Sequence, residues 1–224
     1  MCLFTSLPYK KHTQSFINRL SVPSALVATV KLAVLGSTRG SDLQFILDSI
    51  KARKLDATVD IVISNKKDAY ILERARMHGI PAVFVDSKGK TREQFDQEVL
   101  KVLESYKPDL ILLIGYMRIL SPQFVQAYKN RIMNVHPSLL PAYAGGMDLD
   151  VYRAMLKNKE TVGGITVHFV DEGVDSPQII VQKKYKIEQD DSPETMKEKA
   201  QKLEGEAFVE AITLFSQGKL KVQA

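Results

Sequence analysis

The sequence predicts an α/β fold: a doubly wound, mostly parallel sheet, followed by an antiparallel hairpin and a long final helix. Two observations predict the sheet. From residue 31 onward, short apolar strands alternate with amphipathic helical patterns three times, with short connections between them. The later run Leu110–Ile114 is apolar at every position and lies between a proline–aspartate pair and Gly115. Such a run is typical of a central parallel strand that is covered on both faces.

The first half of the fold is expected to contain three strand–helix units. The apolar residues Leu43, Phe45, Ile46 and Ile50 recur at helical spacing and form the expected inner stripe of the first helix, with Ser41 or Asp42 as its N-cap. Glycine at position 79 is expected to end the second helix. The strands are predicted at 31–35, 60–64 and 81–85, and the helices at 41–53, 69–78 and 90–106.

The second half is expected to carry the hairpin and the final helix. A short helix from Ser121 and a strand at 131–135 follow the central strand. Alternation of apolar residues predicts an antiparallel pair at the sheet's edge, and Pro193 is suited to the first turn of the last helix. The remaining elements are predicted as a helix at 149–157, strands at 165–171 and 178–185, and a helix at 193–217.

The composition is that of an ordinary globular protein. The chain has 224 residues, 25% of them charged, with a formal net charge of +5. We expect residues 31–224 to form one domain and residues 1–30, which are basic, rich in Ser and Thr and free of acids, to form a flexible extension. That composition overlaps with organelle transit peptides, although a cytoplasmic location is preferred. No apolar run has the length of a membrane span, so no membrane is expected as a partner. The net charge is only modestly basic, and a phosphorylated metabolite explains it as well as a nucleic acid does, so no nucleic acid is expected as a partner.

The loop Gly36-Ser-Thr-Arg-Gly-Ser41 joins the first strand to the first helix. Its small residues allow backbone N–H groups to face an anion, and the helix N-terminus adds positive potential there. Arg39 would neutralise part of a phosphate. The loop matches neither a dinucleotide-binding nor a Walker pattern, and a simple tight turn is the alternative interpretation.

Asn134 and His136 are predicted at the carboxyl end of a central strand, where ligands bind in open parallel sheets. A neutral amide donor beside an imidazole can stabilise a developing oxyanion and move a proton. An aspartate from the turn around 171–175 would favour the charged imidazole and raise the pKa of His136. His168 is assigned a structural role. No cluster of Cys and His has the spacing of metal ligands, so no metal is expected.

Four segments together resemble the folate-dependent phosphoribosylglycinamide formyltransferase family. They are Gly115-Tyr-Met-Arg-Ile-Leu-Ser-Pro122, Asn134-Val-His-Pro-Ser-Leu-Leu-Pro141, Val167-His-Phe-Val170 and Asp175. The resemblance runs from about residue 31 to the end of the chain. It implies a Rossmann-like formyltransferase core. It also implies transfer of a formyl group from 10-formyltetrahydrofolate, as co-substrate, to the primary amine of 5-phosphoribosylglycinamide in de novo purine synthesis.

The resemblance also implies residue roles. Asn134, His136 and Asp175 match the catalytic residues of the family. Gly40, Ser41 and Asp42 match its phosphate loop, and Glu204 matches a contact to the ribosyl substrate. Folate contacts are implied for Asn134, for Arg92 and for the segment that wraps the pterin ring, which contains Met117, Arg118, Ile119 and Leu120.

The sequence departs from the family pattern at four places. The phosphate loop is one residue longer, Asp42 replaces the usual asparagine, Ser176-Pro177-Gln178 replaces a glycine-rich turn, and Tyr152 replaces a frequent histidine. Two alternatives stay open. One is a formyltetrahydrofolate hydrolase, although 30 residues are too few for the regulatory domain of that family. The other is a catalytically silent module that binds folate or nucleotide. Oligomeric state, monomer or homodimer, is left open by the sequence.

Overall fold

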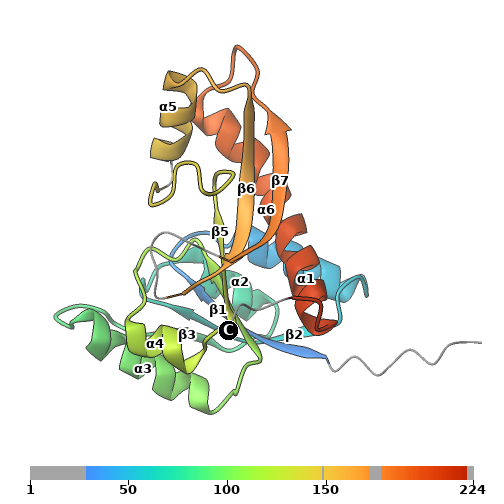
Figure 1. Ribbon diagram of the computed structural model, residues 1–224. Helices are drawn as coiled ribbons and strands as arrows, with labels where there is room; N and C mark the ends of the chain where they lie inside the picture. Colours follow the sequence, from blue (N-terminus) through green and yellow to red (C-terminus); the bar gives the residue numbers. More distant parts are fainter. Residues whose placement is uncertain (1–28, 148, 172–177, 221–224) are drawn as a thin grey trace, which may run out of the picture.

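The computed structural model describes residues 29–147, 149–171 and 178–220. The helices and strands alternate through most of the chain (Figure 1). The strands are Val30–Gly36 (β1), Ala57–Ser64 (β2), Ala82–Phe84 (β3), Leu110–Ile114 (β4), Ile132–His136 (β5), Val162–Phe169 (β6) and Ile179–Lys186 (β7). The helices are Ser41–Lys51 (α1), Tyr70–Met77 (α2), Arg92–Glu104 (α3), Pro122–Ala127 (α4), Leu149–Lys157 (α5) and Pro193–Ser216 (α6).

The strands form one seven-stranded sheet in the order β3-β2-β1-β4-β5-β6-β7. Strands β1 to β5 are parallel to their neighbours, whereas β6 is antiparallel to both β5 and β7. The predicted doubly wound sheet, the terminal antiparallel pair and the long last helix are therefore confirmed. The chain winds from β1 toward β3 and then crosses to the other side of β1 to form β4. This reversal creates a crevice at the carboxyl ends of β1 and β4, where α/β proteins bind ligands.

Both faces of the parallel strands are buried, as the apolar run of β4 predicts. Leu110, Leu112 and Ile114 pack on the face that α1, α2, α5 and α6 cover. Ile111 and Leu113 point to the opposite face, which α3 and α4 cover. Because successive side chains of a strand alternate between faces, only a continuous apolar run can fill both cores.

Two details of α1 differ from the sequence-based expectation. The N-cap is Gly40, in the left-handed conformation and without a side-chain cap, rather than Ser41 or Asp42. Phe45, expected on the inner stripe, is 40% exposed and lies against α6, where a Cβ atom on Gly205 would collide with its ring. The glycine thus allows close approach of two helices.

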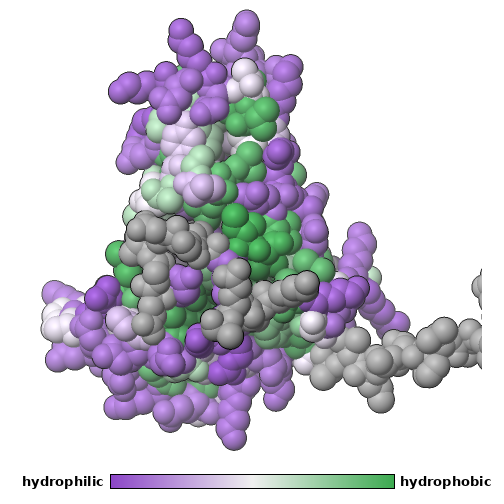
Figure 2. Space-filling model, viewed as in Figure 1, coloured by the Kyte–Doolittle hydropathy of each residue, from purple (hydrophilic) through white to green (hydrophobic). Residues whose placement is uncertain are grey.

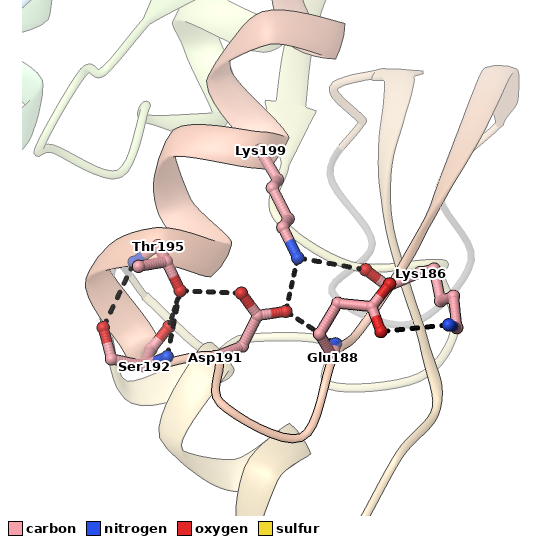
Figure 3. A network of polar contacts seen from close by, with 6 residues as sticks. All are labelled: Lys186, Glu188, Asp191, Ser192, Thr195 and Lys199. Atoms are coloured by element: carbon pink, nitrogen blue, oxygen red, sulfur yellow. Dashed lines mark hydrogen bonds and ion pairs between the residues drawn. The ribbon is translucent and has the colours of Figure 1, made fainter.

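The start of α6 is fixed by a network of polar contacts (Figure 3). Ser192 and Thr195 form a reciprocal capping box, in which each hydroxyl accepts the other residue's backbone N–H. Asp191 accepts hydrogen bonds from Thr195 Oγ1 at 2.8 Å and from Lys199 Nζ at 2.5 Å. These contacts set where the helix begins and hence which residues of α6 face the sheet.

Hydrophilic residues cover most of the face shown in Figure 2, and hydrophobic residues gather near its middle, where β6, β7 and α6 lie. Within the described ranges, the helices are all too short or too polar to cross a bilayer. The expected extension at residues 1–30 lies almost wholly outside the described residues, and the single-domain boundary stays a prediction.

We expect Ser192→Ala to lower the free energy of unfolding by about 1 kcal/mol, because the variant loses an N-cap acceptor at the start of α6. For a chain of this size the melting temperature would fall by about 2–4 °C. Thermal unfolding followed by circular dichroism measures the change. Glu206→Ala, at an exposed position of the same helix, is the control and should melt within a degree of the wild type.

Candidate active site

A cavity of about 370 Å³ lies at the carboxyl ends of β1, β4 and β5. This volume is within the range of about 300–1,000 Å³ that is usual for small-molecule sites. The cavity brings together segments that are distant in sequence. Its lining residues from the predicted set are Gly40, Ser41, Asp42, Met117, Asn134, His136 and Glu204.

The loop from β1 to α1 forms one wall, and its path depends on glycine. Gly40 has φ of 68°, a conformation that favours glycine, and a Cβ atom there would lie 2.5 Å from Ile71 Cγ1. The carbonyl of Thr38 accepts the N–H of Ile71 at 3.1 Å, which ties the loop to α2. The loop therefore turns tightly and places the N-terminus of α1, with its free N–H groups, at the cavity.

Ser37 links this loop to the segment after β4. Its N–H donates to the Gly115 carbonyl at 3.1 Å, and its hydroxyl accepts the N–H of Met117 at 3.0 Å. The same hydroxyl donates to Asn65 Oδ1 at 2.6 Å. Ser37 is 4% exposed, so these bonds are shielded from water. The two walls of the crevice are thus joined by one buried side chain.

Asn134 is oriented by His168, which faces it across β5 and β6 as its register partner. His168 Nδ1 lies 2.8 Å from the Phe169 carbonyl, which can only accept, so Nδ1 carries the proton. Burial lowers the pKa of His168, so the ring is neutral near pH 7 and its bare Nε2 accepts the amide N–H of Asn134 at 3.3 Å. The structural role predicted for His168 is therefore to position the Asn134 amide.

His136 is held by the loop that follows β5. Its Nε2 donates to the Tyr143 carbonyl at 2.9 Å, which leaves Nδ1 of the neutral ring as an acceptor. Burial lowers the pKa of His136, and the Tyr143 carbonyl opposes that shift. The imidazole is therefore neutral near pH 7, with Nδ1 unprotonated. Asp175, expected to raise this pKa, lies outside the described residues, and its role stays a prediction.

Asp42 and Glu204 form a hydrogen-bonded carboxyl pair in the cavity wall, one from α1 and one from α6. Burial raises the pKa of Asp42 to about 7, although hydrogen bonds with Ser41 and Glu204 partly oppose it. Burial is the main cause that raises the pKa of Glu204 to about 8. The charge of Asp42 adds to this shift, and the positive charge of Lys197 opposes it. Two carboxyl groups bond to each other only when one keeps a proton, so the pair is not doubly charged at neutral pH.

The predicted folate residues are divided among the cavity, the protein surface and the interior. Met117 lines the cavity and Ile119 is 77% exposed, whereas Leu120 is buried beneath α3 and α4. The guanidinium of Arg118 lies 4.4 Å from the centre of the Phe95 ring, away from the cavity lining. Arg92, at the start of α3, pairs with Glu93 at 3.2 Å and also lies outside the lining.

Several lining residues were not predicted from the sequence. Lys197 and Gln201 project from α6 together with Glu204, at positions i, i+4 and i+7 of one helix face, and this spacing was the available signal. Arg39, which the sequence suggested as a partner for a phosphate, also lines the cavity. The lining residues outside the predicted set are Thr38, Ile114, Gly115, Tyr116, Val135, Pro137, Gly146, Met147, Tyr152, Lys197 and Gln201. Among the described residues, no group of three or more His, Cys, Asp or Glu is arranged to hold a metal ion.

A family model described as formyl transferase matches residues 30–212, which include every strand of the sheet. The chain belongs to the formyl transferase family. It is 40% identical over 194 residues to phosphoribosylglycinamide formyltransferase from Escherichia coli strain K12, across 86% of this chain and 90% of that relative. The resemblance read from the four sequence segments is confirmed.

Solved structures of the formyl transferase family have the same fold. Glycinamide ribonucleotide transformylase 1 from Symbiobacterium toebii matches with a TM-score of 0.83 at 38% identity, over 88% of this chain and 92% of that one. A formyltetrahydrofolate deformylase from Pseudomonas syringae pv. tomato matches with a TM-score of 0.80 but 24% identity, over 88% and 64%. That second likeness is one of fold alone.

The stability of this formyl transferase is expected to depend on pH through its Asp42–Glu204 carboxyl pair. The folded pKa of Asp42, about 7, exceeds the ordinary value of 3.8, and that of Glu204, about 8, exceeds 4.5. Between about pH 4 and pH 8 the folded chain therefore binds more protons than the unfolded chain, and the pair's contribution to stability declines as pH rises. Asp42→Asn removes one titrating group and lets Glu204 ionise more easily.

We expect Asp42→Asn to raise the melting temperature at pH 8 by about 2–4 °C, which corresponds to about 1 kcal/mol, and to change it little at pH 5. Scanning calorimetry of both proteins across this pH range measures the difference. Asp48→Asn, which removes an exposed carboxyl from the same helix, is the control. Parallel pH profiles of wild type and Asp42→Asn would contradict the shared proton.

Proposed function

We propose that this chain transfers a formyl group from 10-formyltetrahydrofolate to the primary amine of 5-phosphoribosylglycinamide, a step of de novo purine biosynthesis. The proposal rests on the set of chemical groups that line one cavity. It holds an anion-binding helix N-terminus, an oriented amide, a neutral imidazole and a carboxyl pair. Each of these groups has a task in joining a phosphorylated amine to a formyl carbon.

In this proposal the phosphoribosyl end of the substrate lies at the loop before α1. The backbone N–H groups of Gly40, Ser41 and Asp42 would bind the phosphate, since the N-terminus of a helix attracts anions. Arg39 and Lys197 also line the cavity and add positive charge. Glu204 would accept hydrogen bonds from the ribose hydroxyls. The proton shared with Asp42 limits the negative charge that the phosphate meets there.

The reaction needs an oxyanion donor and a proton carrier. The substrate amine attacks the formyl carbon, and the carbonyl oxygen becomes negative in the tetrahedral intermediate. Asn134, held by His168, would donate its second amide N–H to that oxygen. His136 would accept the proton that the amine loses and pass it to the folate nitrogen as the carbon–nitrogen bond to the folate breaks. No proton is gained or lost overall.

Asp175 and the folate contacts complete the proposal. A carboxylate at Asp175 would stabilise the imidazolium that forms on His136 during the proton transfer. The backbone of Met117, Arg118, Ile119 and Leu120 would hold the pterin ring, and Arg92 would contact the folate farther from the reacting carbon. We also propose that the enzyme works in the cytoplasm.

Formyl transfer from 10-formyltetrahydrofolate to 5-phosphoribosylglycinamide, followed by folate absorbance, tests the activity directly. We expect turnover that depends on the acceptor. Equal turnover without acceptor would instead indicate a formyltetrahydrofolate hydrolase. Absence of turnover with retained folate binding would indicate a catalytically silent module, and either result would refute the proposed transfer.

We expect His136→Ala to lower kcat by about 10²–10⁴-fold, the usual effect of removing a group that carries a proton in the transition state. Folate binding, measured by calorimetry with tetrahydrofolate, should change by less than threefold. His78→Ala removes an exposed imidazole outside the cavity lining and serves as the control. A kcat within threefold of wild type would remove His136 from the proton path.

We expect Asp175→Asn to lower kcat and to move the acid limb of the pH–rate profile to lower pH, because loss of the negative charge lowers the pKa of His136. The profile of kcat/KM from pH 5 to 9 measures the shift. An unchanged rate and profile would remove Asp175 from the mechanism.

A further inference from the structure

Three buried polar atoms without a hydrogen-bond partner gather behind the segment after β4. They are Asp96 Oδ1, Tyr116 Oη and Arg118 Nε. Burial is the main cause that raises the pKa of the Tyr116 phenol, and the negative charge of Asp96 adds to it. The carboxylate of Asp96 and the phenol of Tyr116 therefore interact electrostatically. Because buried polar atoms are nearly always paired, two of them beside an unpaired oxygen of one carboxylate require a reason other than stability.

Asp96 is the centre of this group. It lies on α3, is 1% exposed, and its Oδ2 accepts the backbone N–H of Ser121 at 2.5 Å. Ser121 in turn caps α4, since its Oγ accepts the N–H of Phe124 at 3.3 Å. A carboxylate is costly to bury, and burial raises the pKa of Asp96 against the Ser121 N–H and the charges of Arg118 and Arg92. The bond to Ser121 fixes one end of the segment.

The other end of the segment is fixed by Ser37, whose hydroxyl accepts the N–H of Met117. Between these two bonds, Ile119 is exposed, while the Arg118 side chain is turned back onto Phe95, the residue before Asp96. The backbone from 117 to 120 is therefore stretched between a bond to the β1 loop and a bond to α3.

We propose that Asp96 is a positioning residue of the folate site, which holds segment 116–121 against α3 so that its backbone is in place for the pterin ring. The proposal rests on the proposed function, because the pterin is expected at this segment. Asp96 does not line the cavity and takes no part in the chemistry. Its loss should therefore weaken folate binding and leave the phosphoribosyl end and the chemical step nearly unchanged.

The test compares Asp96→Ala, Asp96→Asn and Asp109→Ala with the wild type. Asp109 is the matched control because its Oδ2 accepts a backbone N–H, that of Lys31, at 2.9 Å, but at the opposite end of the sheet. Tetrahydrofolate binding is measured by calorimetry and the KM of each substrate by formyl transfer. Thermal unfolding reports the stability of every variant. Asp96→Asn keeps the volume and an acceptor for the Ser121 N–H, so it allows the measurement where Asp96→Ala fails to fold.

We expect Asp96→Ala to raise the Kd for tetrahydrofolate and the KM for 10-formyltetrahydrofolate about tenfold, and Asp96→Asn about threefold. The KM for 5-phosphoribosylglycinamide and kcat should stay within twofold. Asp109→Ala should lower the melting temperature without changing the Kd for tetrahydrofolate.

Three results would overturn the proposal. The first is an unchanged Kd for tetrahydrofolate in Asp96→Ala, or in Asp96→Asn if the alanine variant does not fold. The second is an equal rise in the KM of both substrates. The third is an equal loss of folate binding in Asp109→Ala. A wild type that binds no tetrahydrofolate would overturn the proposed function as well, so the two failures are distinguishable.

Discussion

The reversal of strand order between β1 and β4 is the constraint on which the site depends. The chain leaves β1 toward β2 and leaves β4 toward β5, on opposite sides of the β1–β4 pair. Neither connection covers the space beyond the carboxyl ends of these two strands, so a crevice forms there. Ser37 makes the crevice rigid, because its N–H bonds to Gly115 and its hydroxyl to Met117 and Asn65. The β1–α1 loop and the segment after β4 are therefore positioned relative to each other by one buried residue. Movement of either would disturb both.

The antiparallel end of the sheet supplies the contacts that orient Asn134 and the turn after His136. A parallel neighbour of β5 would return through a crossover helix, whereas β6 runs antiparallel directly beside it. This pairing sets His168 opposite Asn134, and the Phe169 carbonyl then determines which ring nitrogen carries the proton. Thr166, two residues earlier, bonds the Ser138 carbonyl and the Leu140 N–H, and so holds the turn that follows His136. Strand β6 thus orients the amide of Asn134 and holds the turn after His136.

The sequence predicted most of the architecture, because buried parallel strands leave a strong signal. The bounds of β4 and α5 agree with their prediction to the residue. Predictions from local sequence patterns were wrong where a tertiary contact overrides the local preference. Phe45 fits the apolar stripe of α1 but packs on Gly205 in the middle of α6, which no local pattern reveals. Gly40 caps α1 because Ile71 leaves no room for a side chain there, and Lys197 and Gln201 enter the cavity only because α6 crosses α1.

The structure also changes how Asp42 is understood. From the sequence alone, a carboxylate in a loop that is expected to bind phosphate is a like charge in the wrong place. In the fold, Asp42 is 4% exposed and bonded to Glu204, so the buried pair keeps a proton where two separate carboxylates would not. Because Glu204 has the higher pKa of the two, it is the better holder of that proton at neutral pH. The pair therefore presents less negative charge to the loop than two free carboxylates would, and that charge rises as the pH becomes alkaline.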